Sequence, residues 1–248
     1  MNADRITHPL RLAKGSHQPG SGKGCAMNVI SYINGDTRVT DFPACSAHPL
    51  AVLVQSCNDL LAGPDGYLSP ENSVLALDLG WQTVGTADNT ATVIHAWVAE
   101  LLTDPTWGVA RYARLAAIKP ILDIAALHRA AASGGMSSSV AWNGVDRAAR
   151  AAARALDHAS NPAGLCAIQT AYQSTALAHD HRRATLAAVT GSAVRAHALA
   201  AGDDAATRIV ELTRHAIRAW RDLAQFAPAR DPRPSSVDDA RLHMAAVA

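Results

Sequence analysis

The sequence has few aromatic side chains, little charge imbalance and no long apolar run. Only two Phe, four Tyr and five Trp occur among 248 residues, so a core has to be built mainly from Ala, Leu, Val and Ile. The formal net charge of +1 gives no whole-protein argument for binding nucleic acid, a membrane surface or an acidic partner. There is no apolar stretch of about 18 residues and no signal-peptide run, which predicts a cytoplasmic protein without membrane association.

Lysine and cysteine are also scarce. Nineteen of the 22 basic residues are Arg and alanine is abundant, a bias expected from GC-rich coding DNA. The four cysteines are Cys25, Cys45, Cys57 and Cys166. In the cytoplasm these side chains should be reduced thiols unless they bind a metal ion.

Helical periodicity is what the sequence has in abundance. Because no alternating strand pattern occurs, we predict an all-α fold in which an irregular N-terminal arm and a loop-rich segment pack on a multi-helix, alanine-rich bundle. A kink is expected at Lys119-Pro120 and a break near Gly191. The expected helices cover about residues 25–34, 48–62, 70–84, 90–103, 108–132, 141–159, 162–200, 203–226 and 235–246.

Glycine and proline divide the chain. Two prolines and four glycines in residues 1–24 predict a flexible arm. The run SGGMSSS is the clearest linker, at 133–140. We therefore expect an N-terminal helical domain at 25–132 and a C-terminal helical region at 141–248, or one domain formed by both.

The segment from Gly24 to Asp59 concentrates the unusual residues. Cys25, Asp41, Cys45 and His48 offer thiolate, carboxylate and imidazole groups of the kind that bind zinc. Only Cys45 and His48 have the close spacing of a ligand pair, so buried thiols are favoured and no metal or other cofactor is predicted.

Three aspartates of this segment have simple structural interpretations. Asp59 follows an apolar helical face and is expected to accept backbone N–H groups of the preceding loop. Asp36 and Asp41 are expected to form turns.

No catalytic motif is present. The GxSxG, HExxH and dinucleotide-binding patterns do not occur, and the GSGKG run lacks two of the positions of a phosphate-binding loop. No catalytic residue is assigned. The rows Arg147/Arg150/Arg154 and Arg214/Arg218/Arg221 each share a helix face, which leaves phosphate-backbone binding as an alternative.

A succession of short motifs covers about residues 13–88: AKGSH, GCAM, GD, TDFPAC, HPL, ND, LSPE and GT. It resembles an uncharacterised group of proteins common in actinobacteria and their phages, which read approximately AGSH, CxME, AGE, SDHPxC, P, ND and GT. The chain departs from this pattern at Asn28, where the group has Glu, and at Phe42, where it has His. The resemblance implies no named activity. The binding candidates it implies are His17, Cys25, Asp41, Cys45, Asn58, Asp59 and Thr86.

The leading prediction is a non-enzymatic helical protein of actinobacterial or phage origin that acts through protein–protein or self association. One alternative is an enzyme, or a small-molecule or metal binder, that uses the Cys25–Asp59 segment. This alternative predicts that Cys25, Asp41 and Asn58 converge on one concave site. The other alternative is nucleic-acid binding through the Arg-rich helix faces.

Overall fold

The computed structural model describes residues 11–17, 22–87, 90–156, 160–179 and 182–225. The fold is all-α, as the sequence predicts, and the described chain contains isolated β-bridges but no strand. The expected helix at 235–246 lies outside the described residues. The α-helices are α1 (Ala26–Asn34), α2 (His48–Leu60), α3 (Pro70–Gln82), α4 (Ala91–Thr103), α5 (Leu115–Ala132), α6 (Ser139–Ala155), α7 (Pro162–Ser174), α8 (Arg182–Ala201) and α9 (Ala205–Leu223).

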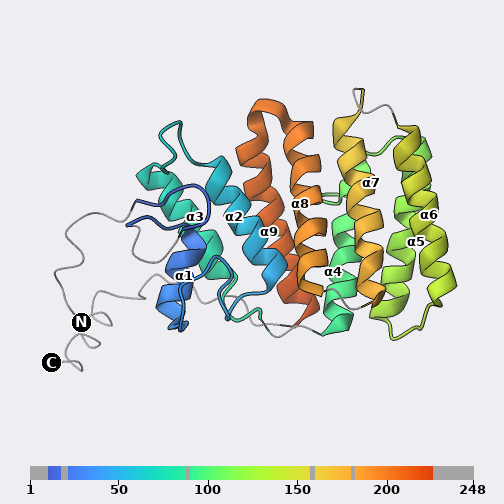
Figure 1. Ribbon diagram of the computed structural model, residues 1–248, viewed down its shortest axis with the longest axis horizontal. Coiled ribbons are helices and arrows are strands. Elements are labelled where there is room, and N and C mark those ends of the chain that lie inside the picture. Colours follow the sequence, from blue (N-terminus) through green and yellow to red (C-terminus); the bar gives the residue numbers. More distant parts are fainter. Residues whose placement is uncertain (1–10, 18–21, 88–89, 157–159, 180–181, 226–248) are drawn as a thin grey trace.

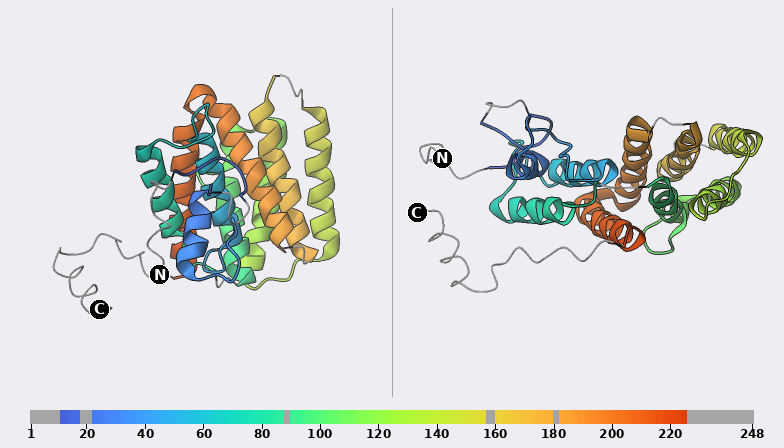
Figure 2. Two further views of the ribbon diagram at one scale, coloured as in Figure 1. Left: turned by 60° about the vertical axis from the view of Figure 1, so that its left-hand side comes forward. Right: turned by 90° about the horizontal axis from the view of Figure 1, so that it is seen from below.

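The helices lie side by side in two layers (Figures 1 and 2). Viewed end-on, one layer contains α1, α2, α8, α7 and α6, and the other contains α3, α9, α4 and α5. Neighbours within and between the layers pack against one another, with α8 against α2, α7 and α9. Helices from the two halves of the chain are therefore interleaved.

Helix ends follow the sequence signals closely. Gly35 adopts a left-handed conformation with φ 78° and ends α1, where its N–H donates to the Tyr32 carbonyl at 3.1 Å. Ser69 caps α3 by accepting the Asn72 N–H at 3.2 Å, and Pro70 occupies the first helical position. These boundaries confirm the predicted ones.

Two predicted breaks lie elsewhere in the structure. The 108–132 region divides at Ala113 and Arg114, whose extended backbone separates the 3₁₀-helix η2 (Val109–Tyr112) from α5. Pro120 lies inside α5, in its second turn, where it removes a single intrahelical hydrogen bond.

The second correction concerns 162–200. Gly191 lies within α8, and the break comes earlier, at the 3₁₀-helix η3 (Thr175–His179). There the Ser174 and Thr175 hydroxyls donate to the Ala171 and Tyr172 carbonyls, both at 2.7 Å, which competes with the regular helical pattern.

The described part of the N-terminal arm is attached to the body of the protein. Leu12 is fully buried, and its carbonyl accepts the Leu68 N–H at 2.9 Å. The Ala13 N–H donates to the Gly24 carbonyl at 2.8 Å. Residues 1–10 and 18–21 of the predicted arm lie outside the described part.

One continuous cluster of buried side chains includes residues from both sides of the 133–138 loop. Its largest fully buried members are Trp97 of α4 and Trp220 of α9, whose rings meet edge-on with centroids 5.5 Å apart. Ile209, Leu212 and Ile217 of α9 are buried together with Trp220 and form one apolar stripe. No helix in the described ranges combines the length and apolarity needed to cross a bilayer.

Candidate functional site

Asn58 and Asp59 of α2 hold the arm and α1 together. The Asn58 side chain is fully buried; its Oδ1 accepts the Ala26 N–H at 3.1 Å and its Nδ2 donates to the Ala13 carbonyl at 2.9 Å. Asp59 Oδ1 accepts the Gly15 N–H at 2.8 Å, so the carboxylate bonds to backbone as expected, but in the N-terminal arm and not in the preceding loop. These bonds satisfy backbone groups of two other segments, which is a structural role.

Cys25 and Asp41 meet beside this junction. The Cys25 thiol donates to Asp41 Oδ1 at 3.5 Å, and Asn28 Nδ2 donates to the same oxygen at 2.8 Å. Asn28 Oδ1 also accepts the Cys25 N–H at 3.0 Å. Gln55 Nε2 reaches both Asp41 Oδ2 and Ser16 Oγ at 3.3 Å, which continues the chain of bonds to the surface. Asn28 is a position at which the sequence departs from the resembling group, and its side chain links Cys25 to Asp41.

The Cys25 thiol is poorly suited to nucleophilic chemistry. Its side chain is fully buried, and burial together with the negative charge of Asp41 raises its pKa to about 12. At neutral pH the group is therefore a thiol and not the reactive thiolate. We call the bonded set Ala13, Gly15, His17, Cys25, Asn28, Asp41, Asn58 and Asp59 the arm network.

Cys45 and Thr86 belong to a different contact. Thr86 Oγ1 accepts the Ala47 N–H at 2.9 Å and donates to the Thr83 carbonyl at 2.6 Å. The Cys45 carbonyl accepts the Gly85 N–H at 2.8 Å. Ala47 is the N-cap of α2, so a hydroxyl 39 positions away satisfies the backbone N–H of that cap residue.

The proposed zinc ligands do not form a ligand set. Among the described residues, no three His, Cys, Asp or Glu side chains are grouped closely enough to hold a metal ion. His48 instead stacks on Phe42, with ring centroids 4.4 Å apart, and burial lowers its pKa. His17 Nε2 donates to the Ala13 carbonyl at 3.2 Å.

The two arginine rows are partly used within the protein. Arg221 donates to the Gln82 and Val84 carbonyls at 3.1 and 3.0 Å, at the C-terminal end of α3. Glu211, on the same helix as the second row, pairs with Arg208 at 3.0 Å. Arg150 pairs with Asp146 at 2.9 Å.

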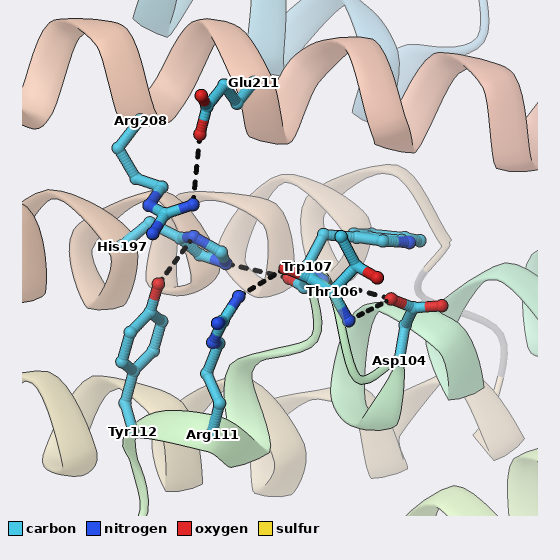
Figure 3. Close-up of polar contacts among 8 residues, drawn as sticks. All are labelled: Asp104, Thr106, Trp107, Arg111, Tyr112, His197, Arg208 and Glu211. Atoms are coloured by element: carbon cyan, nitrogen blue, oxygen red, sulfur yellow. Dashed lines mark hydrogen bonds and ion pairs between the residues drawn. The ribbon is translucent and has the colours of Figure 1, made fainter.

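A second polar cluster lies between η2, α8 and α9 (Figure 3). His197 of α8 is almost fully buried, and its Nε2 lies 2.9 Å from the Trp107 carbonyl. A carbonyl only accepts, so Nε2 carries the proton and Nδ1 accepts. Tyr112 Oη, 3.0 Å from Nδ1, must therefore be the donor in this bond.

Charged side chains surround this phenol–imidazole pair. Arg111 rises from η2 and Arg208 comes from α9 toward the same imidazole. Burial, with the charges of both arginines, lowers the pKa of His197 to about 4, while burial raises that of Tyr112. We call the eight labelled residues the Tyr112 cluster: Asp104, Thr106, Trp107, Arg111, Tyr112, His197, Arg208 and Glu211.

A third group of hydrogen-bonded side chains joins α4, α5 and α7. Ser174 Oγ donates to the Ala171 carbonyl, so it accepts from His128 Nε2 at 2.9 Å. His128 Nδ1 then accepts from His95 Nδ1 at 2.7 Å. Burial and the neighbouring His95 lower the pKa of His128 to about 3. Trp142 of α6 packs edge-on against His128, with centroids 5.0 Å apart.

The sequence analysis did not single out these histidines. His128 follows Ile124 and Ala125, and His197 follows Ala193 and Val194, at the spacing of a buried helical stripe. A titratable side chain in such a stripe indicates a hydrogen-bonded neutral group. That signal was available in the sequence, although their partners were not.

Comparison with protein-family models, with curated proteins and with solved structures gives no match. The resemblance over residues 13–88 stays a prediction.

Proposed function

We propose that the protein is a non-enzymatic binding protein that associates with a second copy of itself through the C-terminal half of α1. One observation carries this proposal: Tyr32 and Ile33, adjacent on α1, are 72% and 58% exposed. The earlier turns of the same helix bury Ala26, Met27 and Ile30, so the exposed apolar area is confined to its C-terminal end. Tyr is enriched in protein interfaces because it contributes both apolar area and a hydroxyl.

The end of α1 presents this pair rigidly. The Gly35 N–H donates to the Tyr32 carbonyl, and the Asp36 N–H donates to the Ser31 carbonyl at 3.2 Å. Asp36 is in turn held by Ser31, Asn34 and the Ala44 N–H at 2.7, 2.6 and 3.2 Å. Little conformational freedom would be lost at this end of the helix on binding.

The charge pattern favours a second copy as the partner. In a two-fold interface, residues near the axis face their own copies, so a charged residue there would meet a like charge. The α1 sequence AMNVISYIN contains no Asp, Glu, Lys or Arg. The nearest carboxylate, Asp36, is turned to its own loop by its hydrogen bonds.

The oligomeric state of the full chain tests this proposal. Light scattering after size exclusion, over about two decades of concentration, should show a monomer–dimer equilibrium. The double variant Tyr32→Ser/Ile33→Ser should weaken it by about 30-fold or more, as expected for the centre of an interface.

Met136→Ser is the matched control, because Met136 is fully exposed but lies in the loop between α5 and α6. This variant should dimerise like the wild type. A wild-type protein that stays monomeric, or a double variant with unchanged dimerisation, would overturn the proposal.

We further propose that the protein acts in the cytoplasm. All four cysteines lie in the described part and are free thiols, which supports a reducing compartment. An actinobacterial or phage origin is what the resemblance over residues 13–88 predicts.

A further inference from the structure

The Tyr112 cluster combines hydrogen-bond donors and an acceptor on one polar surface. Arg111 and Tyr112 come from η2, His197 from α8 and Arg208 from α9. The Arg111 guanidinium lies 5.9 Å from the centre of the Tyr112 ring. The Arg111 and Arg208 side chains both extend toward the hydrogen-bonded pair of Tyr112 and His197 (Figure 3).

The hydrogen-bond direction at Tyr112 is fixed from inside the protein. The Trp107 carbonyl sets the tautomer of His197, and His197 Nδ1 then takes the Tyr112 proton. The phenol oxygen therefore presents its remaining lone pairs to anything that approaches it. A ligand at Tyr112 has to donate a hydrogen bond.

The arginines impose the opposite requirement. A guanidinium has five N–H donors and no acceptor. Arg208 uses Nη1 for Glu211 at 3.0 Å, and Arg111 uses Nη1 for the Thr106 carbonyl. Asp104 accepts the Thr106 and Trp107 N–H groups at 2.7 and 3.0 Å, so its charge is already hydrogen-bonded. A ligand between the arginines has to carry negatively charged acceptor oxygens.

We propose that Arg111, Tyr112 and Arg208 bind a phosphate group that still carries a proton. The anionic oxygens accept from the two guanidinium groups, and the P–OH group donates to Tyr112 Oη. The Glu211 carboxylate beside Arg208 disfavours a fully ionised oxyanion. Sulfate has the same shape but no proton at neutral pH, so this site discriminates against it.

Isothermal titration of the full chain at pH 7 with inorganic phosphate and with sulfate tests the proposal. Wild-type protein should bind phosphate about tenfold or more tightly than sulfate, because sulfate leaves the Tyr112 oxygen facing an unprotonated oxygen. Tyr112→Phe should abolish this preference. Arg208→Gln should weaken the binding of phosphate by about tenfold.

Arg218→Gln is the matched control, since Arg218 is exposed on the same helix and lies ten residues along it. It should bind phosphate like the wild type. Three results would each overturn the proposal. They are equal affinity of the wild type for phosphate and sulfate, a retained preference for phosphate in folded Tyr112→Phe, and equal losses of phosphate affinity in Arg208→Gln and Arg218→Gln.

Two further measurements keep the outcome unambiguous. Near-ultraviolet circular dichroism verifies that Tyr112→Phe is folded. If Tyr112→Phe does not fold, Arg111→Gln replaces it: Arg111 is exposed, and this variant should weaken phosphate binding. Methyl phosphate, compared with inorganic phosphate at about pH 5.5, where the ester also carries a proton, distinguishes the source of the group: equal affinity assigns a phosphate ester, and weaker binding assigns free phosphate. The Tyr32→Ser/Ile33→Ser variant should bind phosphate normally, because this site is separate from the proposed dimer contact.

Discussion

The arm network and the Tyr112 cluster both rest on buried polar side chains, but their hydrogen bonds end in different places. Asn58 and Asp59 bond to the backbone of Ala13, Gly15 and Ala26, so they join segments of the chain. In the Tyr112 cluster the bonds start at a backbone carbonyl and lead through His197 to a half-buried phenol beside arginines. Polar burial thus stabilises the fold in the first region and sets the chemistry of a surface in the second.

Acidification should have the largest effect on the free energy of unfolding. An unfolded histidine has a pKa of about 6.5, whereas the fold lowers those of His197 and His128 to about 4 and about 3. Between these values the unfolded chain binds more protons, so the free energy of unfolding falls as the pH falls. Urea denaturation should show a loss of about 2 kcal/mol per histidine between pH 7 and pH 5.

The variant His197→Gln is the control for this prediction. It removes one strongly shifted histidine, so it should reduce the loss of unfolding free energy between pH 7 and pH 5 by about 2 kcal/mol, whatever its stability at pH 7. An unchanged dependence would show that His197 is not held neutral by the fold.

Removing the central amide of the arm network should have the next largest effect. Asn58→Ala leaves the buried Ala26 N–H and Ala13 carbonyl without their partner and should cost about 3 kcal/mol of unfolding free energy in urea denaturation. Asp59→Ala, at a partly exposed position with one backbone bond, should cost about 1 kcal/mol. Equal losses would contradict the central role of Asn58.

The smallest stability effect is expected at the outer end of the Tyr112 cluster. Tyr112→Phe removes one hydrogen bond to a neutral imidazole and should cost about 1 kcal/mol at pH 7 in the same denaturation measurement. A loss as large as that of Asn58→Ala would mean that the two regions are alike and that Tyr112 is mainly structural.

Local features were predictable where one stretch of chain was sufficient. The end of α1 at Asn34 and the start of α3 at Pro70 were expected, and so was the bonding of Asp59 to backbone, although its partner is Gly15 of the arm. The expected break near Gly191 was wrong because side chains at Ser174 and Thr175 interrupt the helix earlier. Of the binding candidates, Cys25 bonds to Asp41 and Asn58 bonds to the neighbouring Ala26, whereas Cys45 and Thr86 bond at the start of α2.

The sequence by itself determined the all-α class, most helix ends and the inward face of each amphipathic helix, because these depend on bonds and spacings within a few residues. Only the tertiary structure decided that Cys25 meets Asp41, that Thr86 serves Ala47 and that His197 lies between Trp107 and Tyr112. Such contacts join residues 16 to 90 positions apart. They depend on which helix faces pack together, and that choice is made by the whole core rather than by any one segment.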